Sequence, residues 1–274
     1  MIALAEAPTA PAPRTRSENQ IISELRETVS ASRLSLFLQC RLKFWFRYVA
    51  GLKKPKTPAL HLGGSVHQVL RAWNMARWKG TPMSLKDLYD VYQAAWGDQE
   101  EEPVSWDEDE DDQKKVGWRL LETYFRESSI AAYARPEAVE VAVDADLSRH
   151  GLPALIGVID LVHQNRIIDF KTSSQTPNPG KVAHTNEVQT CSYALLYREA
   201  TGKRESGIEF HSLVKLKNPK VVITALEPMS EQQQTRFFHL IEAYVAGLDR
   251  RDFVPSPGLQ CVACEWFNEC RNWR

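Results

Sequence analysis

Two short runs of β-branched and apolar residues, separated by four polar residues, constrain the fold of this chain more than any other feature. Residues 157–162 and 167–171 are typical of strands, and residues 163–166 between them have the character of a tight turn. A hairpin of this kind fixes its own register through the length of its turn. A two-residue turn at Gln164 and Asn165 predicts that position 162 pairs with 167, and position 160 with 169.

That register brings two carboxylates, those of Asp160 and Asp169, to the same face with Cβ atoms roughly 4.5–5.5 Å apart. Because two like charges at this distance repel, we expect a hard divalent cation with oxygen ligands to offset them. Lys171 shares the face of Asp169, since side chains repeat every two residues along a strand. Two acids and an ammonium group directed at one point suit phosphodiester hydrolysis. The alternative is a pair of solvated carboxylates on an open sheet face.

The cysteines form a second pattern. Cys261, Cys264 and Cys270 make a C-x2-C-x5-C segment near the C-terminus, and Cys40 lies far upstream. Four thiolates can hold either zinc or an iron–sulfur cluster. Zinc ribbons usually contain two C-x2-C pairs, so the three-plus-one arrangement favours a [4Fe–4S] cluster, with zinc as the alternative. Disulfides are not expected in a chain without a secretory signal, and Cys191 is expected to be a small buried hydrophobe.

Five motifs follow one another along the chain. They are a helix at 32–48 containing Cys40, a G-x-x-x-H segment at 63–67, the D…D-x-K hairpin, a Q-x-x-x-Y segment at 189–193 and the terminal cysteines. In this order they resemble the RecB-type branch of the PD-(D/E)XK nucleases. Iron–sulfur members of that branch include CRISPR-adaptation exonucleases and helicase-associated nuclease domains. The resemblance covers about residues 30–274.

The resemblance implies a role for each matching residue. The side chains of His67, Asp160 and Asp169 and the backbone carbonyl of Phe170 are expected to bind Mg²⁺ or Mn²⁺. Lys171 is expected to orient the attacking water or to stabilise charge on the phosphate. The remaining assignments are Gln189 and Tyr193 as positioning groups, and Cys40, Cys261, Cys264 and Cys270 as ligands of a [4Fe–4S] cluster. Separately from the resemblance, Glu140 on the preceding strand is a candidate outer group.

The expected fold is α/β, a restriction-endonuclease-like central mixed sheet flanked by helices, with a helical subdomain. An iron–sulfur staple would join the N- and C-terminal segments. Hydrophobic periodicity and turn residues predict the individual elements. Helices are expected at 32–48, 65–78, 84–96, 113–128, 186–201 and 230–250, and strands at 138–146, 155–162, 167–171, 208–214 and 221–225.

The expected organisation is a disordered leader rich in alanine and proline at 1–29, followed by a single nuclease domain at 30–274. Within that domain, a helical insertion at 79–135 contains an acidic loop at 98–112, and residues 255–274 form the cluster-binding segment. The chain has 34 basic and 35 acidic residues, but residues 98–112 hold ten of the acids. Without that loop the balance is 34 against 25, or +9, so the remaining body can bind phosphates electrostatically.

The sequence therefore predicts a metal-dependent DNA exonuclease that prefers single strands or DNA ends, in repair, recombination, phage replication or CRISPR adaptation. We expect it to be cytoplasmic and outside the membrane, because no apolar run approaches 20 residues. No phosphate-binding loop of an ATPase is present, so a helicase or another recombination or adaptation protein is a candidate partner. The alternatives are a non-catalytic DNA-binding or scaffold subunit of a helicase or integrase complex, and a zinc-stapled protein that binds nucleic acid.

Overall fold

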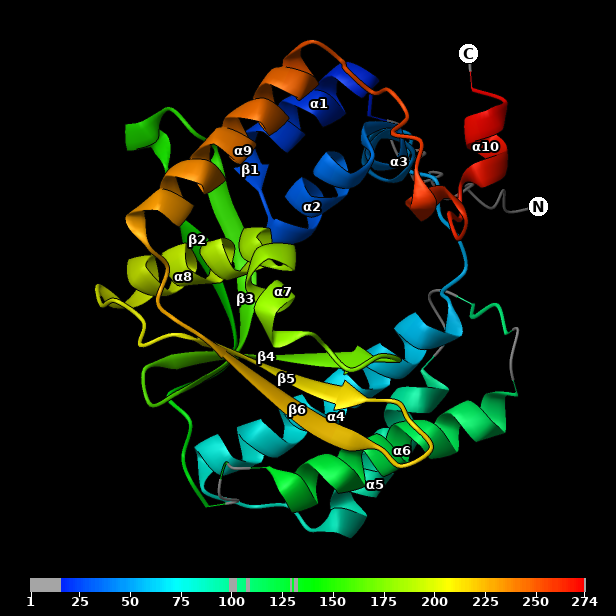
Figure 1. The fold of residues 1–274 in the computed structure, drawn as a ribbon, viewed down its shortest axis with the longest axis vertical. Coiled ribbons are helices and arrows are strands. Elements are labelled where there is room, and N and C mark those ends of the chain that lie inside the picture. The colour runs from blue at the N-terminus through cyan, green and yellow to red at the C-terminus, as the bar shows by residue number, and fades with distance from the viewer. Residues whose placement is uncertain (1–15, 99–102, 107–108, 129, 131–132, 274) are drawn as a thin grey trace, which may run out of the picture.

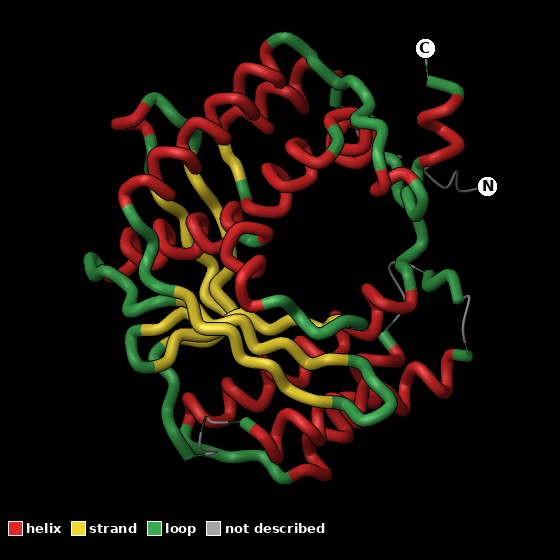
Figure 2. The backbone as a smooth tube through the Cα atoms, viewed as in Figure 1, coloured by secondary structure: helices red, strands yellow, loops and turns green. Residues whose placement is uncertain are grey.

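A six-stranded mixed sheet forms the centre of the fold (Figures 1 and 2). The structure, a computed structural model, describes residues 16–98, 103–106, 109–128, 130 and 133–273. The strand order is β1-β3-β4-β5-β6, with β2 paired to β3; β1–β3 and β4–β5 are parallel and the other pairs antiparallel. The strands are β1 (Thr28–Val29), β2 (Ala138–Ala145), β3 (Ala154–His163), β4 (Arg166–Ser173), β5 (Ile208–Val214) and β6 (Lys220–Leu226).

Helices cover both faces of the sheet, which confirms the predicted α/β class with a mixed central sheet. One layer contains α1 (Glu18–Glu27), α2 (Ala31–Gln39), α8 (Glu187–Thr201) and α9 (Glu231–Asp249). The other contains α4 (Pro58–Lys79), α5 (Leu85–Gly97) and α6 (Glu110–Glu127), which Figure 1 shows together below the sheet. The shorter helices are α3 (Arg41–Phe44), α7 (Pro179–Thr185) and α10 (Phe267–Arg271).

The hairpin of β3 and β4 divides its side chains between two hydrophobic cores. The cross-strand pair of Val162 and Ile167 packs into the core that contains α8 and α9. The next pair, Leu161 and Ile168, packs into the core that contains α4, α5 and α6. This alternation follows from the two-residue period of a strand. It also assigns Asp169 and Lys171, in step with Ile167, to the face covered by α8.

Local sequence signals account for most helix boundaries. Capping boxes begin α1, α5 and α9, and Thr57 caps α4 with Pro58 in its first turn. The predicted helix at 65–78 therefore begins earlier, at Pro58, and it ends at Gly80 in the left-handed conformation. The other predicted strands and helices, apart from those discussed below, lie close to their expected bounds. Among the described helices, none is both long enough and apolar enough to cross a membrane.

The leader predicted at 1–29 is wrong for its second half. Residues 16–29 belong to the fold, and residues 1–15 lie outside the described part of the chain. Ser17 and Gln20 form the capping box of α1, which buries Ile22 and Leu25 against the core. Strand β1 then pairs with β3, and Figure 1 shows α1 beside α9. The alanine- and proline-rich composition that suggested a leader ends before this amphipathic segment begins.

The continuous helix predicted at 32–48 is interrupted at Cys40. This residue is extended, with φ −163° and ψ 111°, between α2 and α3, and residues 45–49 continue as a π-helix. Immediately after the break, the Leu42 backbone N–H donates to the Val254 carbonyl at 3.1 Å. The C-terminal segment therefore supplies a partner for a backbone group near the interruption, which local propensity alone does not anticipate.

The acidic loop predicted at 98–112 is also partly helical. Asp109 caps α6, and Glu110, Asp111 and Asp112 form its first turn, where negative charge is favourable beside the positive end of the helix dipole. Residues 99–102 and 107–108 of the predicted loop lie outside the described residues. Helices α5 and α6, within the predicted insertion at 79–135, share one hydrophobic core with α4 and the sheet.

Candidate active site

The turn predicted between β3 and β4 is present, and both of its residues have positive φ angles, 52° at Gln164 and 60° at Asn165. Pairing runs from His163 opposite Arg166 to Leu161 opposite Ile168 and then stops. Asp160 and Asp169 occupy the next step of this register, but they are not a ladder pair as predicted. Instead, the Phe170 backbone N–H donates to Asp160 Oδ2 at 3.3 Å.

Strand β4 pairs with β5 along its other edge, both beside β3 and beyond the point where its pairing with β3 stops. Asp169 lies opposite Phe210 and Lys171 lies opposite Ser212 in the parallel β4–β5 ladder. The same edge of β3 pairs with β1 only at its other end, around Leu155. Asp160 therefore lies between two partner strands on an edge that neither of them covers.

Asp169 is the most constrained residue of the site. It is only 1% exposed, and its Oδ1 accepts hydrogen bonds from Gln189 Nε2 at 3.0 Å and from the Tyr193 hydroxyl at 3.1 Å. Gln189 Nε2 also donates to the Tyr193 hydroxyl at 2.9 Å. The two α8 residues are one helical turn apart and so share a face. Burial and the neighbouring carboxylates raise the pKa of Tyr193, so its hydroxyl stays protonated and available as a donor.

Lys171 contacts the other oxygen of Asp169. Its Nζ lies 2.8 Å from Asp169 Oδ2 as an ion pair, and among the described residues this buried oxygen accepts no hydrogen bond. The lysine side chain is 37% exposed. The ammonium group therefore offsets the charge of the buried carboxylate, although no hydrogen bond completes the surroundings of Oδ2.

His67 reaches the site from α4, in the opposite helical layer. Its Nε2 lies 2.8 Å from the Phe170 carbonyl oxygen, to which it can only donate. Its Nδ1 lies 3.7 Å from Asp160 Oδ2. In the tautomer protonated at Nε2, Nδ1 and Oδ2 are therefore two acceptors that face each other. A proton or a cation between them would satisfy both.

Asp160 also carries unbalanced charge. Its burial, followed by the nearby charge of Asp169, raises its pKa to about 6, whereas His67 acts in the opposite direction. The predicted metal ligands thus comprise two acids, one imidazole and one backbone carbonyl. One of the acid oxygens, Asp169 Oδ2, accepts no hydrogen bond from the described residues. This donor set fits a hard divalent cation. Among the described residues, however, no three His, Cys, Asp or Glu side chains already form a metal-binding group.

A cavity of about 700 Å³ opens beside these residues. His67, Phe170 and Lys171 line it together with Gly63 of the predicted G-x-x-x-H segment and with Gln68 and Thr172, to which the sequence assigned no role. A Cβ atom at Gly63 would lie 3.1 Å from Thr172 Oγ1, so glycine allows α4 to approach β4 closely. The Gly63–Gly64 pair before His67 was the sequence signal for this contact.

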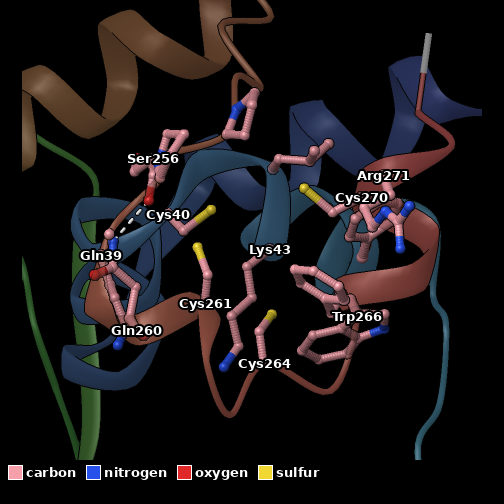
Figure 3. Close-up of a pocket in the computed structure, with 16 residues that line it drawn as sticks. Gln39, Cys40, Lys43, Ser256, Gln260, Cys261, Cys264, Trp266, Cys270 and Arg271 are labelled. Carbon is pink, nitrogen blue, oxygen red and sulfur yellow. Dashed lines mark hydrogen bonds between the residues drawn. The ribbon is translucent and has the colours of Figure 1, made fainter.

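The four predicted cluster ligands line a second cavity, of about 370 Å³. Figure 3 shows the sulfurs of Cys40, Cys261, Cys264 and Cys270 directed into this common space. All are free thiols, and burial, followed by the proximity of Cys40, raises the pKa of Cys270. A soft four-thiolate set suits zinc or an iron–sulfur cluster. Cys191 is buried elsewhere, in α8, as expected.

Ion pairs connect the C-terminal cysteine segment to the N-terminal half of the chain. Lys43 of α3 lies 2.8 Å from Glu265, and Lys54 lies 2.5 Å from Glu269. Trp266 is buried against Leu42 and Phe46 in a small core of its own. The two chain ends are therefore adjacent around the thiols even though this segment buries little apolar surface.

Comparisons with known proteins bear on the family and on the fold. The profile of the PD-(D/E)XK nuclease superfamily matches residues 28–271. The crystal structure of a "Putative exonuclease" from Eubacterium rectale has a TM-score of 0.61 over 96% of this chain and 94% of that chain. Their identity is 14%, which shows a shared fold alone. The structure of SSO0001, at 14% identity over 87% of this chain and 92% of its own, has a TM-score of 0.33 and supports no conclusion. No curated protein matches the chain significantly.

Proposed function

Because this chain belongs to the PD-(D/E)XK nuclease superfamily, we propose that it is a metal-dependent DNA exonuclease that acts on single strands or DNA ends. The observation that carries the proposal is the convergence of His67 from α4, Asp160 from β3, and Asp169 and Lys171 from β4. Among the described residues, Asp169 Oδ2 accepts no hydrogen bond and forms an ion pair with Lys171. A protein that only bound DNA would have no need to bury two neighbouring carboxylates here, where burial and the charge of Asp169 raise the pKa of Asp160 to about 6.

His67, Asp160, Asp169 and the Phe170 carbonyl would hold Mg²⁺ or Mn²⁺. When bound, such an ion lowers the pKa of a coordinated water and polarises the scissile phosphate. Lys171, which lines the cavity, would donate to the attacking water or to a phosphate oxygen. Gln189 and Tyr193 keep Asp169 in place by donating to its Oδ1, so the cation would bind at Oδ2, beside Lys171.

The charge distribution of the chain and the cavities beside the site support DNA as the substrate. Outside residues 98–112 the chain has an excess of nine positive charges, which attracts a polyanion. The cavity beside Lys171 extends to the first turns of α4, and a second cavity of about 710 Å³ opens beyond Gln189 and includes Arg236 and His239. A strand that crosses Lys171 could occupy both. A helicase or a recombination or adaptation protein would supply the free ends.

Cys40, Cys261, Cys264 and Cys270 would hold a [4Fe–4S] cluster with a structural role. Cys40 reaches the shared cavity from one segment and the three other cysteines reach it from the C-terminal segment, and the ion pairs of Lys43 and Lys54 bring these segments together. Zinc is the competing occupant, because the same four ligands suit it. Absorbance near 400 nm and the iron and zinc content of the purified protein distinguish the two.

The nuclease proposal is tested with DNA labelled at the 5′ or 3′ end, as single and double strands, with Mn²⁺ or with EDTA. We expect Mn²⁺-dependent degradation from ends, with circular single strands resistant. Lys171→Met should abolish cleavage while DNA binding persists, whereas Lys181→Met, at an exposed lysine of α7, should leave cleavage unchanged. Binding without cleavage by the unmodified protein would favour a scaffold role and contradict the proposal.

A further inference from the structure

Glu140 has an unusual backbone for its position. It lies inside strand β2, yet its φ angle is +49°, and it is the only residue within the described strands with a positive φ. A residue other than glycine is strained in the left-handed region, and such strain persists only where the surrounding structure imposes it. Asparagine and aspartate tolerate this region better than glutamate does. The sequence at this position is therefore not the one that the local backbone prefers.

The strain coincides with a gap in the sheet opposite Asp160. The β2–β3 ladder pairs Val139 with Leu161 and Val141 with Ile159, so Glu140 and Asp160 face each other in register. They are nevertheless not a ladder pair, and pairing with β4 also stops before Asp160. Asp160 thus lacks a ladder partner on both edges of β3. Its carboxylate can consequently turn towards the Phe170 N–H and His67.

Among the described residues, the Glu140 carboxylate makes no stabilising polar contact that would explain its position. Within the described residues it makes no hydrogen bond and no ion pair. It is half-buried, and its charge is one of the causes that raise the pKa of Asp160. A third carboxylate therefore lies beside two that already repel each other. Repulsion among these carboxylates destabilises the metal-free protein. Binding of the cation is expected to relieve that repulsion and so to stabilise the fold.

We propose that Glu140 is a positioning residue of the active site, which opens the sheet at Asp160 and strengthens the binding of the divalent cation with its charge. This inference rests on the proposed function, because it needs a cation between Asp160 and Asp169. Glu140 would act through Asp160 and would not need to touch the cation. Removing its charge should therefore weaken cation binding, while easing its backbone should stabilise the metal-free protein.

Three variants separate charge from strain. Glu140→Gln removes the charge but keeps a side chain that is disfavoured at positive φ. Glu140→Asn removes the charge and also eases the backbone strain. Glu140→Asp keeps the charge and eases the backbone strain. Asp144→Asn is the matched control, because Asp144 lies on the same strand and is exposed, in regular pairing with Ile156. Mn²⁺ affinity is measured by titration calorimetry without DNA, and Tm is measured in EDTA.

We expect Mn²⁺ to bind about tenfold more weakly to the Gln and Asn variants, since one nearby charge is lost. The Asp variant and the Asp144→Asn control should bind within about threefold of the unmodified protein. In EDTA, the Tm of Glu140→Asn should rise by about 2–4 °C. Unchanged Mn²⁺ affinity in Glu140→Gln, or a lower Tm of Glu140→Asn in EDTA, would overturn the role of Glu140 alone. Failure of the unmodified protein to bind Mn²⁺ would overturn both this inference and the proposed function.

Discussion

Asp169 and the cysteine cavity differ in how many side-chain contacts the protein itself provides to the functional groups. Three side chains contact the Asp169 carboxylate, and strands β4 and β5 fix its backbone. Around the cavity, by contrast, no described side chain bonds any of the four thiols, and the local core consists of Leu42, Phe46 and Trp266. The sheet preorganises the first region, so substitutions there should affect the rate of cleavage. We propose that the second region depends on a cofactor, so substitutions there should affect folding.

The largest effect is expected at the cysteine cavity. Cys261→Ala should destabilise the protein by about 4–5 kcal/mol, because a cofactor that bridges Cys40 and the terminal segment closes a very long loop. The variant should be colourless and prone to aggregation. Cys191→Ala, which removes a buried thiol from α8, should keep the cofactor and lose about 1 kcal/mol. Thermal melts and the absorbance near 400 nm provide the measurement, and a stable, active, colourless Cys261→Ala protein would remove the contrast between the two regions.

The next largest effect is expected at Asp169. Asp169→Asn preserves the shape of the side chain and should lower the rate of DNA cleavage about 10³-fold, because the site loses a charged ligand. Its Tm in EDTA should stay within a few degrees of that of the unmodified protein, since the repulsion from Asp160 is also removed. Cleavage rates on end-labelled DNA and circular dichroism melts check this pair of outcomes. If the variant failed to fold, Asp169 would be required for folding, as we propose for the cysteines.

A pH effect on stability is expected from Asp160. Its pKa in the folded protein is about 6, above its ordinary value of 3.8, so the folded state binds the proton more tightly between these values. This stabilisation is present at low pH and is lost as the pH rises through about 6. In EDTA, the unmodified protein should therefore lose about 1.4 kcal/mol relative to Asp160→Asn between pH 5 and pH 7.5. If the free energy of unfolding of the two proteins had the same pH dependence, the pKa of Asp160 would not be raised in the folded protein.

The smallest effect is expected at Tyr193. Tyr193→Phe removes one of the two hydrogen bonds to Asp169 Oδ1, and Gln189 still donates the other. A hydrogen bond to a charged group contributes about 1.5 kcal/mol, so kcat should fall about tenfold with little change in KM. Steady-state kinetics on a labelled single strand measure both constants. A change in KM alone would instead indicate that Tyr193 contacts the DNA.

The sequence predicted the β3–β4 hairpin because local signals specify it completely. The turn at Gln164 and Asn165 sets the register, and alternation assigns Leu161 and Val162 to opposite cores. The end of the ladder before Asp160 was not predictable in this way, because the turn and the alternation of side chains set the register but not the residue at which pairing stops. The positive φ of Glu140 was equally hidden, since no local signal in the strand requires it.

Elements stabilised by distant contacts were harder to predict. The break at Cys40 coincides with a hydrogen bond from Leu42 to Val254, more than 200 residues away. Helix α7 is short and was missed, although Asn178 caps it and Pro179 occupies its first turn. The candidate site was predicted from the sequence because its residues follow an ordered set of motifs, which included Gly63. Gln68 and Thr172 were given no role because they line the site through the packing of α4 against β4.

The most direct test of the central claim is to locate Mn²⁺ by its anomalous X-ray scattering in crystals of the protein grown with that ion. The account predicts a peak about 2.2 Å from oxygens of Asp160 and Asp169, with His67 Nδ1 or Nε2 and the Phe170 carbonyl completing the ligands. Lys171 Nζ should face the ion without binding it. A peak elsewhere, in a protein that degrades DNA in Mn²⁺, would contradict the proposal that these acids share the catalytic cation.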